Sequence, residues 1–132
     1  MFAFWEDAPV TSEGSPDTRF QRALSSGNVL LVTAAAAELG RRLALPDALA
    51  VTLVYLDADP ARYPRAATRL HARYCLEVRA VDPAESLLVL AALRALPSPV
   101  AGAAAREALL ELFEARGLRP AIRVLEEWRP DR

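Results

Sequence analysis

The chain's one histidine and one cysteine stand four residues apart, inside the stretch "RYPRAATRLHARYC" (residues 62–75). On a helix, His71 and Cys75 would lie one turn apart on the same side. Such a pair can be half of a zinc site or a Cys–His dyad. Zinc takes four ligands, and the sequence has no second Cys or His. A nucleophilic cysteine also needs an oxyanion hole and an orienting third group, and the sequence identifies neither.

We therefore predict no catalytic, cofactor-binding or metal-binding residue. In this interpretation Cys75 packs as a small hydrophobe, and His71 bonds to a backbone carbonyl. The five glycines are too scattered for a phosphate-binding loop, and no G-x-S-x-G, H-E-x-x-H or C-x-x-C motif occurs. An enzyme with an unrecognised site remains the third-ranked alternative for the function.

An arginine ridge runs along the same stretch. Four arginines fall within about 80° of one another on a helical projection: Arg62, Arg65, Arg69 and Arg73. The opposite face is aromatic and aliphatic: Tyr63, Ala67, Leu70, Tyr74 and Val78. Charge on one helix face normally means exposure to solvent. The alternative hypothesis is a docking surface for an acidic partner or for the phosphate backbone of RNA.

Residues 1–16 have a different composition and are predicted to form an N-terminal arm. The arm holds Phe2, Phe4 and Trp5, then Glu6 and Asp7, and it has no arginine. Burial of the aromatics should decide where the arm goes, because exposed ion pairs contribute little. Three outcomes stay open: the arm clamps onto its own domain, docks on a foreign partner, or crosses to a second copy and makes a dimer.

The elements that position these residues are predicted to be helices. Hydrophobic residues are 53% of the 132-residue chain, and most of them are Ala and Leu, which favour helix. Pro16, Pro46 and Pro83 are each followed closely by an acid, which is typical of a helix start. The predicted helices cover residues 17–25, 28–42, 46–58, 60–79 (with a start anywhere in 60–64), 83–96, 100–116 and 119–128.

Two details of this prediction concern single elements. The helix over residues 28–42 is apolar on almost every side, so we expect it to lie centrally. Asp59 is expected to cap the helix that follows Pro60. The predicted fold is all-α, with about seven helices in packed antiparallel hairpins, a single domain over residues 17–129 and the arm before it.

A weak internal repeat suggests stacked helix pairs. The segments "PDALAVTLVYLDADP" and "PAESLLVLAALRALP" both begin and end with proline. They place Leu53 with Leu90, and Leu56 with Leu93, in equivalent positions. This spacing is near the period of helical-hairpin repeats. We expect all four leucines to be buried.

Composition also limits the partners and the compartment. The net charge is −1 and all 16 cations are arginine, so no overall field attracts nucleic acid or an anionic membrane. One cysteine cannot form an intramolecular disulfide. The start "MFAFWEDAP" lacks the basic region of a signal peptide, and no apolar run is long enough to span a bilayer. These features favour a cytoplasmic protein without a membrane partner.

The run "RYPRAATRLHARYCLE", followed by "LLVLAALRALP", resembles short all-helical hypothetical proteins of GC-rich bacterial genomes, over residues 19–128. That group has no assigned activity, so the resemblance carries over no functional residue. The sequence therefore predicts a non-enzymatic interaction or adaptor module without a cofactor, which binds a protein partner or itself. The alternative is a phosphate-backbone or RNA contact through the arginine ridge.

Overall fold

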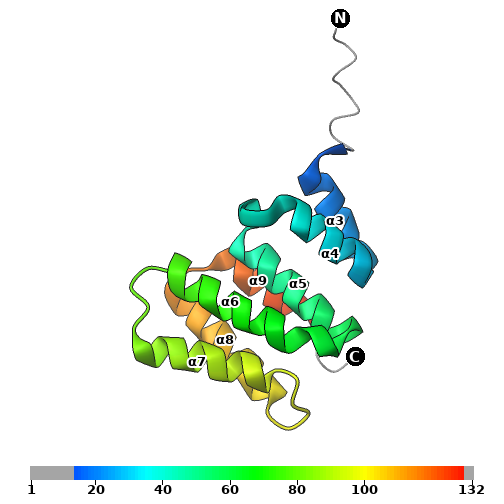
Figure 1. Cartoon of the computed structure of the whole chain (residues 1–132). Helices are drawn as coiled ribbons and strands as arrows, with labels where there is room; N and C mark the ends of the chain where they lie inside the picture. Colours follow the sequence, from blue (N-terminus) through cyan, green and yellow to red (C-terminus); the bar gives the residue numbers. More distant parts are fainter. Residues whose placement is uncertain (1–13, 130–132) are drawn as a thin grey trace, which may run out of the picture. The chain divides into compact units, whose positions relative to one another are not determined.

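A computed structural model describes residues 14–129 of the chain. These residues form seven α-helices and two short 3₁₀ helices, η1 and η2, and no strand (Figure 1). The all-α prediction is confirmed. The elements are α3 (Pro16–Ser26), α4 (Val29–Leu39), η1 (Gly40–Arg42), α5 (Leu45–Ala58), η2 (Pro60–Arg62), α6 (Tyr63–Glu77), α7 (Pro83–Ala95), α8 (Gly102–Arg116) and α9 (Arg119–Glu127). Over residues 14–129, none of these helices is long and apolar enough to cross a membrane.

Polar caps explain where several helices begin. The side chains of Ser15, Asn28 and Asp82 each accept a hydrogen bond from a backbone N–H in the first turn of α3, α4 and α7. These donors would otherwise lack a helical partner. Gly27 and Gly117 end α3 and α8 with φ of 69° and 70°, in the left-handed region that suits glycine.

The backbone divides into two units, the first ending at Leu43 and the second beginning at Ala44. In the first unit α3 and α4 pack as an antiparallel hairpin, joined by the turn at Gly27 and Asn28. Phe20, Ala23, Val32, Ala35 and Leu39 are its buried residues. The predicted single domain over residues 17–129 stays a prediction.

Helix α4, in the region predicted as a helix over residues 28–42, is not buried on every side. On α4, Leu30 is 73% exposed and Leu31 is 54% exposed. The helix is apolar all round in sequence, but it buries only the stripe that faces α3 within this unit. An apolar residue on the surface is common, so apolar character alone does not place a helix centrally.

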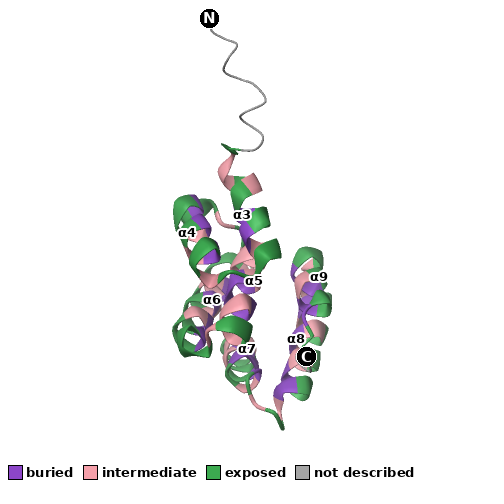
Figure 2. Cartoon of the chain, turned by 90° about the vertical axis from the view of Figure 1, so that its right-hand side faces the viewer, coloured by how far each residue is buried: buried purple, intermediate pink, exposed green. Residues whose placement is uncertain are grey.

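The second unit contains α5 to α9. Each of these helices packs against the next, and α5 also packs against α9. An open helical-repeat stack has no such contact between its first and last helices. Figure 2 shows buried and exposed residues alternating along these helices, as amphipathic packing requires. The fully or nearly fully buried side chains include Leu93, Leu109 and Leu125.

The four leucines of the internal repeat are not equally buried. Leu53 and Leu93 are buried, whereas Leu56 and Leu90 are half-buried. The expectation of full burial is therefore correct for one leucine of each segment. Trp128 is buried after α9, and its indole N–H lies 3.1 Å from both carboxylate oxygens of Asp57 on α5. This bond satisfies the only polar atom of a buried indole.

Candidate interaction surface

Helix α6 is amphipathic in the way the sequence predicts. Tyr63, Ala67, Leu70 and Tyr74 are buried in the core of the second unit. On the other side Arg62, Arg65 and Arg69 are exposed, and Arg73 is half-buried. Arg65, Arg69 and Arg73 therefore share the outer face of α6, and Arg62 stands just before it, as the last residue of η2.

Both ends of the arginine ridge have acidic partners. The Nε atom of Arg62 lies 3.0 Å from Oδ2 of Asp59, and its guanidinium lies 5.8 Å from the ring centre of Tyr55. At the other end, Nε of Arg73 lies 2.7 Å from Oε2 of Glu77. Asp59 stands at the N-cap position of η2, as expected, and its backbone carbonyl accepts from the Arg62 N–H. Its carboxylate caps no N–H and bonds to the Arg62 guanidinium instead.

The two middle arginines are different. Arg65 and Arg69 have no ion pair and no side-chain hydrogen bond within residues 14–129. They stand one turn apart, so their like charges repel each other weakly across the helix surface. An anionic group that bound between them would remove that repulsion.

The register of α6 and α7 shows which residues stand at the same height along the two helices. The hydroxyl of Tyr63 donates to the carbonyl of Leu93, and Nε2 of His71 lies 3.0 Å from the carbonyl of Ser86. The two helices are therefore antiparallel, and this register places Arg69 level with Leu87. Leu87 follows Ser86 by about 100° around α7, which turns it away from the core.

We call four exposed residues, Arg65, Arg69 and Leu76 of α6 and Leu87 of the neighbouring α7, the hairpin face. Leu76 is 85% exposed and Leu87 is 66% exposed. Leu76 lies two turns along α6 from Arg69, at nearly the same angle around the helix. Isolated surface leucines need no explanation. Here two of them accompany two arginines that have no acidic partner, on adjacent helices.

His71 and Cys75 meet a third residue, Ser86 of α7. Nε2 of His71 lies 3.0 Å from both the carbonyl and the hydroxyl oxygen of Ser86. The Cys75 thiol donates to the Ser86 hydroxyl at 3.4 Å, and its sulfur lies 3.5 Å from His71 Nε2. The bond between His71 and a backbone carbonyl is the one that the sequence interpretation proposed, although the thiol is only half-buried.

The hydrogen bonds of His71 depend on its tautomer. With a hydrogen on Nε2, the ring donates to the carbonyl of Ser86, and the same nitrogen then cannot take a proton from Cys75. Residues 14–129 also contain no cluster of three or more His, Cys, Asp or Glu side chains that could hold a metal ion. The three residues instead join α6 to α7.

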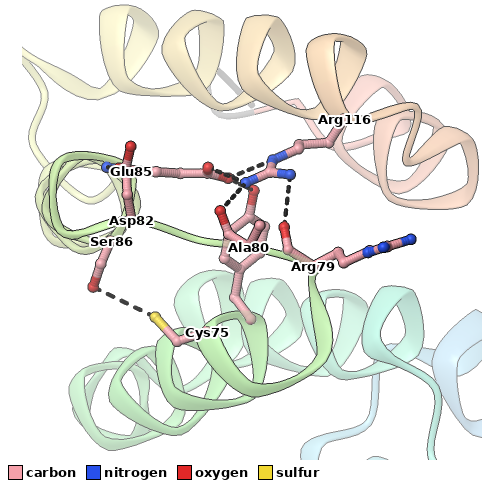
Figure 3. A network of polar contacts seen from close by, with 8 residues as sticks. Cys75, Arg79, Ala80, Asp82, Glu85, Ser86 and Arg116 are labelled. Carbon is pink, nitrogen blue, oxygen red and sulfur yellow. Dashed lines mark hydrogen bonds and ion pairs between the residues drawn. The ribbon is translucent and has the colours of Figure 1, made fainter.

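A second polar cluster, which sequence reasoning missed, ties α8 to α7 and to the loop before α7 (Figure 3). Arg116, in the last turn of α8, forms a two-point ion pair with Glu85, and its Nε lies 2.8 Å from Oε2. The same guanidinium donates to the carbonyls of Arg79 and Ala80. The Tyr74 hydroxyl donates to Glu85 Oε2 at 2.7 Å.

The cluster changes the acidity of its members. The hydrogen bond from Arg116 holds the pKa of Glu85 below its usual 4.5. Burial, with the adjacent Glu85 carboxylate, raises the pKa of Tyr74 well above 10.0. At neutral pH Glu85 and Arg116 are therefore charged and Tyr74 is neutral. The cluster connects α8 to α7 and to the loop before it through an ion pair and hydrogen bonds. The sequence hint was Glu85 in the first turn of α7, but its partner is 31 residues away.

The predicted docking arm cannot be compared with this surface, since Phe2, Phe4 and Trp5 lie outside the described residues. Comparisons of the chain with protein-family models, with curated proteins and with solved structures gave no match.

Proposed function

We propose that this chain is a non-enzymatic interaction module that binds an acidic, amphipathic helix of a protein partner on the hairpin face. The observation that supports the proposal is that Leu76 and Leu87 are exposed on α6 and α7, and that Arg65 and Arg69 of α6 are also exposed and have no acidic partner within residues 14–129. A partner helix with leucines on one side and Glu or Asp beside them would complement both features.

The two kinds of residue would have different roles. Covering a leucine contributes roughly 1.5–3 kcal/mol, whereas an exposed ion pair contributes about 0–1 kcal/mol. Leu76 and Leu87 would therefore supply most of the affinity. Arg65 and Arg69 would set the orientation of the partner and raise its association rate.

A phosphate backbone is the competing ligand. Asp59 and Glu77 neutralise the ends of the arginine ridge, which leaves two arginines for a polyanion. Leucines also offer nothing to a phosphate group. These contacts favour the protein partner over RNA.

The test is an NMR titration of the full chain with three probes. The first is a short synthetic helix with Glu and Leu on one face, the second is the same composition in scrambled order, and the third is a single-stranded RNA. The proposal expects the ordered helix to shift the amides of residues 65–76 and 84–91 more than the scrambled peptide does. It is contradicted if the two peptides act alike. Preferential RNA binding with a steep loss of affinity in salt would support the phosphate alternative instead.

A further inference from the structure

The α3–α4 hairpin of the first unit has a groove of its own. Its volume is about 310 Å³, which is at the small end of ligand clefts in proteins. Ala23 of α3 and Leu31, Ala34 and Ala35 of α4 contribute its apolar lining. Leu31 is 54% exposed, so α4 presents an apolar surface to the groove.

The rim of the groove is charged. Arg19 of α3 pairs with Glu38 of α4, and its Nε lies 3.3 Å from Oε1. Arg22, one turn further along α3, has no ion pair or side-chain hydrogen bond within residues 14–129. The groove therefore offers an apolar floor and one positive charge without an acidic partner. A fitting occupant has large apolar side chains next to an acid.

The chain carries such a segment at its own start. The sequence "FAFWED" places Phe2, Phe4 and Trp5 directly before Glu6 and Asp7. We propose that this segment occupies the groove of its own chain, with an aromatic side chain on the apolar floor and Glu6 or Asp7 beside Arg22. This site is independent of the hairpin face.

The point where the described chain begins supports docking within one chain. Arg19 on the rim donates to the carbonyl of Gly14, so the polypeptide enters at the edge of the groove. From Gly14 back to Trp5 an extended chain reaches roughly 30 Å. Helix α3 is only about 16 Å long, so every point of the groove is within reach.

Two adjacent leucines provide a matched pair of variants. Leu31 lines the groove, and Leu30 is exposed but does not. In the full chain, Leu31→Asp should change the fluorescence of Trp5 towards that of a solvated indole, and Leu30→Asp should not. Since Trp128 also fluoresces, the emission of a Trp5→Leu variant is subtracted. If both aspartates act alike, or neither acts, the proposal is wrong.

Charge exchange tests the register and the direction of docking. Arg22→Glu should release the segment, and adding Glu6→Arg and Asp7→Arg should restore it. Methyl NMR gives a second readout: removal of residues 1–8 should shift Leu31, Ala34 and Ala35 but leave Leu30 and Leu76 unchanged. Shifts at Leu76 instead would overturn the assignment to this groove. Light scattering should show one mass before and after removal, and a dimer that dissociates on removal would refute docking within one chain.

Discussion

At the residue scale, the Tyr63 side chain supplies a hydrogen bond that the backbone of α7 lacks. Its hydroxyl donates to the carbonyl of Leu93 in α7. In a continuous helix that carbonyl would accept from the N–H of residue 97, but Pro97 has none. The hydroxyl thus satisfies an acceptor that the proline leaves without its helical donor.

Tyr63→Phe should therefore cost about 1–3 kcal/mol of unfolding free energy, because it leaves a buried carbonyl without a donor. Tyr74→Phe is the matched control. It also removes a buried hydroxyl, but Glu85 keeps Arg116 as a partner, so the loss should be about 0.5–1.5 kcal/mol. Urea denaturation followed by circular dichroism measures both. Equal losses would show that Pro97 has no part in the effect.

The Glu85 carboxyl predicts a dependence of stability on acid pH. Its pKa is lowered in the folded chain, chiefly by Arg116, so its stabilising effect is complete above pH 4.5 and is lost as the pH falls through the folded value. The stability difference between wild type and Glu85→Gln should shrink over that range. Glu111→Gln, at an exposed position of α8, is the control and should show no such trend.

The two buried tyrosines predict that the folded chain loses stability at alkaline pH. Burial raises the pKa of both Tyr63 and Tyr74 above 10.0. In the unfolded chain both ionise near pH 10, so the free energy of unfolding should fall as the pH rises beyond that value. The double Tyr→Phe variant should lose less stability between pH 9 and pH 11 than wild type, as measured in urea at each pH. An equal loss would contradict this assignment.

At the scale of elements, backbone conformation explains one unusual residue. Ala80, in the loop between α6 and α7, has a φ of 55°, which a side chain disfavours. Its carbonyl, with that of Arg79, accepts from Arg116. The C-terminal end of α8 therefore holds this turn in place.

Ala80→Gly should change stability by about 0 to +1 kcal/mol, since relief of the left-handed strain exceeds the added freedom of the unfolded chain. Gly117→Ala places a side chain at a similar φ of 70° and should cost about 1–2 kcal/mol. Thermal unfolding of the two variants measures both changes in stability, which should have opposite signs. A destabilising Ala80→Gly would mean that this turn is not strained.

Helix positions were predictable because their signals are local. Proline at a first turn, a capping side chain such as Asn28 and a closing glycine such as Gly117 each act within a few residues. The predicted start of α6 lay anywhere in residues 60–64. In the structure the helix begins at Tyr63, so Pro64 sits in its first turn. Arg116 and Glu85 could not be paired beforehand, because their contact depends on how α7 and α8 pack.

At the scale of the whole molecule, the sequence pattern predicts which helix faces are apolar but not which of these faces are buried against another helix. Helix α4 has leucines on several sides, yet only the stripe against α3 is buried within its unit. On α6 the pattern predicts the arginine face correctly. The pattern does not reveal that Asp59 and Glu77 form ion pairs with the arginines at the two ends of this face. Alternative exposed ion pairs differ too little in free energy for the sequence to indicate which one forms.

The central claim, that the hairpin face binds an acidic amphipathic helix, is tested most directly by charge reversal. Arg65→Glu with Arg69→Glu is compared with Arg119→Glu and Arg123→Glu on α9, which are exposed arginines of the same spacing and give the same change in net charge. The measurement is the Kd of the acidic Leu-containing helix by calorimetry. The claim predicts at least a tenfold weakening, worth about 1.4 kcal/mol, for the α6 variant alone. Equal effects of the two variants, or none, would contradict it.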